Sequence, residues 1–285
     1  MRFFFYLILP YLLALPETSF AQAVQAANLS RVAVGIPPQE DLVRRLAGND
    51  LEIQVLLPSG SNHESYEPTF GQLLAISRAS LFIKVGHPRF TLETLLLEKI
   101  IALNPNLKII SGAENVTLQS GDIHYWTSPR RLVQVATSTA EVLKNLLPQS
   151  SAAIEKNKEN LLRELQALDE ELRSLFAPFQ GKSFLVFHPA WGYLAEDYGL
   201  KQLAIENDGK EPGVRRANEI LELATQAQIH TIFIEPGSAE ESIAFFSEKL
   251  HANVQTLNPL AHDWMNSLRD SARAIAHSFG SAAKS

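Results

Sequence analysis

One long amphipathic helix in the middle of the chain is the feature that most limits how the chain can fold. Its apolar residues recur at intervals of three, four and seven positions, and Glu and Lys occupy positions on the opposite face. The apolar positions are Ile154, Leu161, Leu165, Leu168, Leu172 and Leu175. This spacing predicts a helix of about 26 residues, which is about 39 Å long. Because the repeat spans too few heptads to favour a coiled-coil dimer, we interpret residues 150–177 as a rigid helix that links two halves of one molecule.

Short runs that read as strands alternate with helical patterns on both sides of this linking helix. The runs before it are Arg31–Ile36, Leu51–Leu57, Leu81–Val85 and Leu107–Ile110. The runs after it are Phe184–Phe187, Lys201–Ile205, His230–Glu235 and Asn253–Leu257. Strands separated by helices are typical of parallel βαβ units. We therefore predict an α/β fold with two lobes, residues 24–149 and 178–285, each with a roughly four-stranded parallel sheet flanked by helices.

The amino-terminal residues 1–23 have the pattern of a secretory signal peptide. Arg2 precedes the apolar run Phe3–Leu15, and small residues suited to cleavage follow at Ala21 and Ala23. The run is shorter than the roughly 20 residues that a membrane-spanning helix needs, so we favour cleavage near Ala21 or Ala23 over anchoring. We therefore expect an exported protein that works in the periplasm.

Composition excludes several classes of partner and site. A net charge of −6 argues against nucleic acid as a partner. The chain contains no cysteine, so disulfides, thiolate ligands and a lipid attached through cysteine are all excluded. A transition metal would therefore have to be bound by histidines and carboxylates.

Three of the eight histidines fall in loops close to the ends of predicted strands. His63 comes after the second strand, His124 lies in the irregular segment 115–127, and His188 ends the first strand of the second half. His87, after the third strand, is a fourth candidate. In open α/β sheets, ligands bind at the carboxyl ends of the strands, so these side chains can face a cleft between the lobes. Without a local signature such as HExxH, spacing alone makes the metal site a weak hypothesis.

Three short motifs place these histidines in a family context. In chain order they are His63-Glu-Ser-Tyr-Glu-Pro68, Asp122-Ile-His-Tyr-Trp126 and His188-Pro-Ala-Trp-Gly-Tyr193, with the long helix between the second and the third. Their order and spacing resemble those of the metal-binding solute proteins of bacterial ABC importers, the group that takes up zinc and manganese. Further points of similarity are Gly86-His-Pro88, Gly209-Lys-Glu-Pro212, Ile234-Glu-Pro236 and Asn258-Pro-Leu-Ala-His-Asp-Trp264. The resemblance covers nearly the whole chain after the leader.

The resemblance implies two α/β lobes joined by a rigid helix, with one metal ion between them. Proteins of this group bind the ion with three His, or with two His and a Glu, together with an Asp from the second lobe. His124 matches the second ligand and His188 the third. A His at the third position suggests Zn²⁺ as the transported ion, with Mn²⁺ as the alternative, because imidazole suits zinc. The implied partner is the membrane permease of an ABC importer, and we expect a monomer.

The sequence departs from the family pattern at two positions. In the first motif Glu64 stands where the ligand His usually lies, and His63 precedes it. Either residue could bind the metal, and we favour His63, with Glu64 as a fourth ligand or as a group that braces the site. Asn258 stands where many relatives have the ligand Asp, and an amide oxygen is a poorer zinc ligand than a carboxylate. Glu64, a water molecule or Asp263 would then complete the site.

Two other functions fit parts of this pattern. A manganese or iron receptor would share the fold. A zinc hydrolase would use three His and an open position on the metal, with Glu64 as the base, but the chain lacks HExxH and G-x-S-x-G motifs. We therefore predict a high-affinity periplasmic zinc receptor that is not an enzyme.

Overall fold

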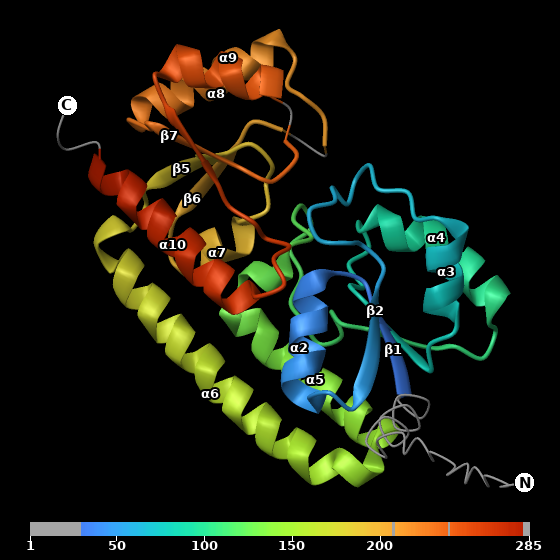
Figure 1. Cartoon of the computed structure of the whole chain (residues 1–285). Helices are drawn as coiled ribbons and strands as arrows, with labels where there is room; N and C mark the ends of the chain where they lie inside the picture. Colours follow the sequence, from blue (N-terminus) through green and yellow to red (C-terminus); the bar gives the residue numbers. More distant parts are fainter. Residues whose placement is uncertain (1–29, 207–208, 239, 282–285) are drawn as a thin grey trace, which may run out of the picture.

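The computed structural model describes residues 30–206, 209–238 and 240–281. Figure 1 shows two α/β lobes that lie along a single long helix. The predicted leader, residues 1–23, lies outside the described residues. Within the described ranges, no helix combines the length and the apolar character needed to cross a membrane.

The first lobe is built on a four-stranded parallel sheet in the order β2-β1-β3-β4. Its strands are β1 (Ser30–Val34), β2 (Leu51–Val55), β3 (Leu81–Lys84) and β4 (Lys108–Ser111). Its helices are α2 (Pro37–Ala47), α3 (Phe70–Ser77), α4 (Thr91–Leu103) and α5 (Pro129–Leu146). Val32 in β1 is fully buried and lies between Ile53 and Leu81 of the neighbouring strands. The apolar run predicted as the first strand is therefore an interior strand of the sheet.

The second lobe repeats this topology, with a parallel sheet in the order β6-β5-β7-β8. Its strands are β5 (Ser183–Val186), β6 (Lys201–Ala204), β7 (Thr231–Ile234) and β8 (Asn253–Thr256). Its helices are α7 (Gly192–Asp197), α8 (Val214–Gln226), α9 (Glu240–Leu250) and α10 (Trp264–Ser281). In each sheet the first strand of the lobe lies between the second and the third. Such a switch point leaves a crevice at the carboxyl ends of the strands, where open α/β folds bind ligands.

The linking helix α6 (Ser151–Phe176) has the 26 residues that the sequence pattern predicts. Its buried residues are Ile154, Leu161, Leu165, Leu168, Leu172 and Phe176. Phe176 rather than Leu175 completes the buried face, since Leu175 is only partly buried. The helix packs against α2 and α5 of the first lobe and against α10 of the second. The prediction of two α/β lobes joined by a long helix is thus confirmed.

One hydrophobic core continues from the first lobe through α6 into the second lobe. It contains Val34 of β1, Leu165 of α6 and Phe184 of β5, all of which are buried. A separate cluster, which includes Ile220 of α8 and Phe246 of α9, fills the far side of the second sheet. Because close-packed cores deform little, this continuity holds the two lobes in a fixed relation and positions the crevice between them.

A non-helical turn follows β5. Pro189 is a residue type that often opens a helix, but α7 begins only at Gly192. The residues between them stay non-helical, and the Trp191 N–H donates to Gln202 Oε1 at 2.7 Å. This hydrogen bond ties the segment that follows His188 to strand β6.

Candidate metal centre

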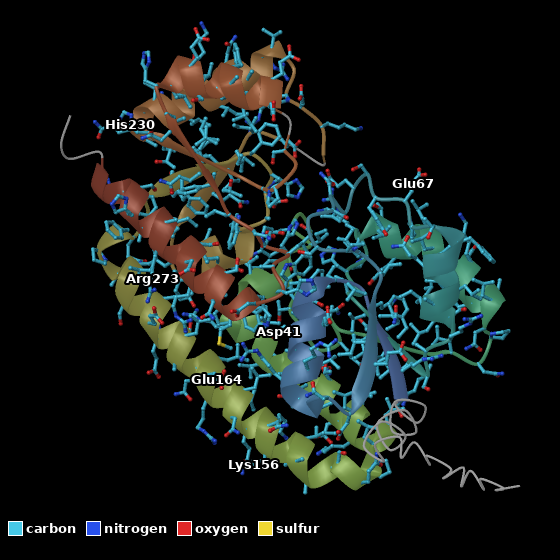
Figure 2. The ribbon with its side chains drawn as sticks, viewed as in Figure 1. Asp41, Glu67, Lys156, Glu164, His230 and Arg273 are labelled. Atoms are coloured by element: carbon cyan, nitrogen blue, oxygen red, sulfur yellow. The ribbon has the colours of Figure 1, made fainter. Side chains whose placement is uncertain are left out.

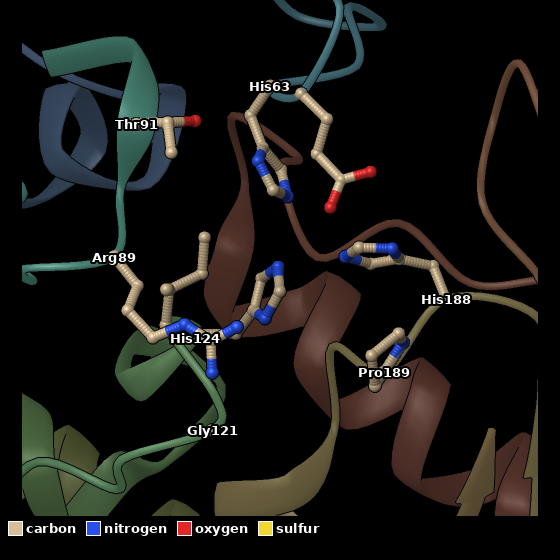
Figure 3. A pocket seen from close by; sticks show the side chains of 9 residues that line it. His63, Arg89, Thr91, Gly121, His124, His188 and Pro189 are labelled. Carbon is tan, nitrogen blue, oxygen red and sulfur yellow. The ribbon is translucent and has the colours of Figure 1, made fainter. Parts of the chain in front are cut away.

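Three imidazole rings from different loops converge in the crevice between the lobes. His63 lies in the loop after β2, His124 precedes α5, and His188 follows β5. The ring centroid of His63 lies 5.4 Å from that of His124 and 5.3 Å from that of His188. The centroids of His124 and His188 are 5.2 Å apart. Figure 3 shows the three rings pointing toward one another.

The Nε2 atoms of these rings are buried and have no hydrogen-bond partner among the described residues. One ring nitrogen of each histidine lies within 4.8 Å of those of the other two, and the rings line a cavity of about 270 Å³. A buried nitrogen without a partner costs about 1–3 kcal/mol. Three such nitrogens that face one another therefore destabilise the metal-free fold. Binding of a cation by the three nitrogens would remove this cost. The arrangement can therefore hold a metal ion.

The loop before α5 fixes the orientation of His124. Asp122 Oδ1 lies 2.8 Å from the His124 backbone nitrogen and 2.6 Å from its Nδ1, and it accepts hydrogen bonds from both. Because the ring proton is donated to the carboxylate from Nδ1, the lone pair is on Nε2 and points into the cluster. The Asp-x-His spacing, which lets the carboxylate reach back over one short turn, could have indicated this role from the sequence.

His188 lies where β5 ends, beside a carboxylate that follows the neighbouring strand β6. Its Nδ1 is 3.1 Å from Glu206 Oε2. This contact gives His188 the same arrangement as His124, with the Nδ1 proton on a carboxylate and Nε2 directed into the cluster. Glu206 comes two residues after the end of β6, and the parallel pairing of β5 with β6 brings it to the ring.

His63 is held by the turn of its own loop and by an aromatic neighbour. The N–H groups of Glu64 and Tyr66 donate to Asn62, at 2.7 Å to its side chain and 3.0 Å to its carbonyl. The His63 ring centroid lies 5.7 Å from that of Phe90. In the described part of the chain, no carboxylate is hydrogen-bonded to this ring, which distinguishes His63 from His124 and His188.

Burial and charge set different protonation states for the three rings. Burial, together with the repulsion of the other two histidines, lowers the pKa of His63 to about 2. Burial also lowers the pKa of His124. For His188, burial alone would lower the pKa, but the hydrogen bond to Glu206 and the charges of nearby carboxylates raise it to about 9. At neutral pH the cluster therefore contains two neutral rings and one imidazolium.

Two further carboxylates surround the cluster. Glu64 lines the same cavity as the histidines, and Glu64, His188 and Glu206 offer ligand atoms within 4.8 Å of one another. Glu64 also lies against Gly209, where the φ of +68° and the close approach of the carboxylate both favour glycine. Glu235, which follows β7, has a buried Oε1 without a partner in the described ranges, and burial raises its pKa to about 7. Carboxylates therefore surround the point where the three Nε2 atoms meet.

Three other candidates from the sequence have different neighbours. Asn258 Oδ1 accepts a hydrogen bond from the Leu260 N–H at 3.0 Å, and the residue lines a separate small cavity. Asp263 accepts a hydrogen bond from Asn266 Nδ2 at 2.7 Å. Both ring nitrogens of His87 have backbone hydrogen-bond partners, each at 3.1 Å. None of the three lines the cavity over the histidine cluster.

Known proteins share this fold over nearly its whole length. Residues 32–278 match the ZnuA family, described as the periplasmic component A of the zinc-uptake complex. A crystal structure of ZnuA is 31% identical, with a TM-score of 0.82, and the match covers 88% of this chain and 99% of that one. A ZnuA deletion mutant crystallised with zinc bound is 32% identical, with the same TM-score of 0.82 and a coverage of 88% and 98%.

A curated relative is the zinc-binding lipoprotein AdcA of Streptococcus pneumoniae serotype 4. It is 26% identical to this chain over 276 residues. The match covers 89% of this chain and 54% of AdcA, so the chain spans about half the length of that relative.

Proposed function

We propose that the chain captures one Zn²⁺ ion between its lobes and delivers it to the permease of an ABC importer. The chain belongs to the ZnuA family of periplasmic zinc-uptake components, which supports this proposal. The observation that carries this proposal is the set of three buried Nε2 atoms, without partners among the described residues, that face one another. Zn²⁺ favours imidazole nitrogen at about 2.0–2.1 Å in tetrahedral sites, whereas Mn²⁺ favours oxygen ligands. The donor set therefore fits zinc better than manganese.

We assign His63, His124 and His188 as ligands through Nε2, and Glu64 as the fourth ligand. Among the described residues, Glu64 is the carboxylate that lines the same cavity as the three rings. The carboxylates hydrogen-bonded to His124 and His188 keep the ring protons on Nδ1, which leaves Nε2 available and makes each ring a stronger donor. The fourth, anionic ligand would offset part of the charge of the ion.

Capture and delivery of an ion require no covalent chemistry, and we propose no catalytic role for the site. The proposed place of work is the periplasm, where the protein would act as a monomer and dock on the permease. The three ligand histidines come from loops of both lobes, so a bound ion would link the lobes across the crevice.

Metal competition at defined free concentrations tests this function. The chain, freed of metal by dialysis against a chelator, is expected to bind one Zn²⁺ ion and to keep it against an excess of Mn²⁺ or Fe²⁺. Elemental analysis of the protein after equilibrium in metal buffers measures both. Preferential retention of Mn²⁺ or Fe²⁺ would assign the chain to the uptake of that metal, and binding of none of these ions would overturn the receptor function.

Replacing Glu64 by glutamine is expected to lower the affinity for Zn²⁺ about tenfold, because a neutral amide replaces an anionic ligand while three imidazoles remain. Competition with a chromophoric chelator measures the change. The matched control is Glu67→Gln, which alters an exposed carboxylate of the same loop at the surface of the first lobe (Figure 2). Unchanged affinity in Glu64→Gln would leave water or another residue as the fourth ligand.

A further inference from the structure

The two oxygens of the Asp122 carboxylate serve different lobes. Oδ1 accepts the hydrogen bonds from the backbone and ring of His124, which belongs to the same loop. Oδ2 accepts a hydrogen bond from the Gly192 N–H at 2.9 Å, at the first residue of α7 in the second lobe. Asp122 is 7% exposed, so water competes little for either contact. One buried side chain thus joins a candidate ligand of the first lobe to the backbone of the second.

We propose, building on the zinc-receptor function above, that Asp122 is a positioning residue that couples His124 to the second lobe through Gly192. The segment 188–192 begins with the ligand His188 and ends at the N–H that anchors Asp122. Two of the three ligand rings therefore take their position from this one segment. A displacement of the segment would move His188 directly and would release Asp122, and with it the orientation of His124.

Glycine at position 192 allows the close approach that this contact requires. A Cβ at this position would lie 2.5 Å from Asp122 Oδ2 and 3.2 Å from Gln119 Oε1. The φ of Gly192 is not positive, so an alanine is allowed by the local backbone and is excluded only by these neighbours. Gly192→Ala therefore disturbs the contact with Asp122 without altering a ligand or the residue that orients it.

Neighbouring contacts hold the same interface by a route that does not involve Asp122. The Gln119 N–H donates to Tyr193 Oη at 2.7 Å, and Gln119 Nε2 donates to Glu196 Oε2 at 2.7 Å. Tyr193 is the next residue after Gly192, so Tyr193→Phe removes one hydrogen bond between the lobes at nearly the same place. The two substitutions separate the coupling through Asp122 from a general loosening of the interface.

The test measures the affinity for Zn²⁺ and the visible absorption of bound Co²⁺, whose bands report the ligand geometry. Gly192→Ala is expected to lower the affinity for Zn²⁺ about tenfold and to shift the Co²⁺ bands. The expected loss is of the size seen when a residue that orients a metal ligand is changed. Tyr193→Phe is expected to leave both unchanged, although it lowers thermal stability. If Gly192→Ala leaves both readouts unchanged, or if Tyr193→Phe changes them equally, the coupling through Asp122 is refuted.

A second measurement covers the case in which Gly192→Ala fails to fold. Coupling between two sites is reciprocal, so loss of the His124 ring should loosen the far end of the connection. In metal-free His124→Ala, hydrogen exchange at the Gly192 amide is expected to be at least about tenfold faster than in the metal-free unaltered chain. An unchanged rate would refute the coupling and leave the receptor function untouched, whereas failure of the unaltered chain to bind Zn²⁺ would refute the receptor function itself.

Discussion

Replacing His188 by alanine is expected to lower the affinity for Zn²⁺ by more than about a hundredfold. Changes in residues that only orient a metal ligand already cost about 10–100-fold in affinity, and this change removes the ligand itself. His188 is also the only one of the three proposed histidine ligands that the second lobe supplies. Without it the ion would be held by loops of the first lobe, and it would no longer link the two lobes.

Competition against a chelator of known affinity measures this loss. The matched control is His230→Ala, because His230 precedes β7 at the end of the sheet opposite the site and is exposed (Figure 2). The control is expected to bind Zn²⁺ as the unaltered chain does. A dissociation constant for His188→Ala within about tenfold of the unaltered value, a difference of under about 1.4 kcal/mol, would show that the ion is held elsewhere.

The two-lobe fold could be predicted because its determinants are local in the sequence. The spacing of the buried residues of α6 defines its length and its inner face without knowledge of what packs there. The buried strands follow in the same way from apolar runs that are too short for helices. The position of His188 is also local, because a buried strand ends where the chain becomes polar. Parallel pairing then places such strand ends at one edge of each sheet.

Asp122 reaches its own ring over two residues, but the carboxylate that orients His188 depends on a tertiary contact, which single segments do not reveal. Glu206 is 18 positions from His188 and reaches it because β6 pairs with β5. Gly192 is 70 positions from Asp122, and neither local sequence indicates their contact. Asn258 illustrates the opposite case, because its position in a family motif made it a candidate ligand. Its Oδ1 accepts a hydrogen bond from the Leu260 N–H, only two residues further along the chain, so this contact is local in the sequence.

Binding of Zn²⁺ is expected to release about one proton per ion at pH 7, and the affinity is expected to fall about tenfold for each pH unit below 9. The proton comes from His188, whose pKa is raised to about 9 by Glu206 and nearby carboxylates despite its burial. In the metal-free protein at pH 7 this ring is an imidazolium, and its Nε2 must lose a proton before it can bind the ion. Since the pKa values of His63 and His124 are lowered, those rings contribute none. Affinity should therefore rise with pH and level off above about 9.

Calorimetry in buffers of different ionisation enthalpy measures the protons released. The matched variant is Glu206→Gln, because the amide oxygen can still accept a hydrogen bond from Nδ1 but no longer carries the charge that favours the imidazolium. It is expected to release fewer protons at pH 7. The raised pKa of His188 also contributes to the stability of the metal-free fold. This contribution is complete below about pH 6.5 and is lost as the pH rises through about 9. The stability of the Glu206→Gln variant should therefore decrease less than that of the unaltered chain as the pH rises from about 6.5 to about 9. If the unaltered chain releases no proton at pH 7, His188 is neutral before the ion arrives, and the carboxylates beside it act by orientation alone.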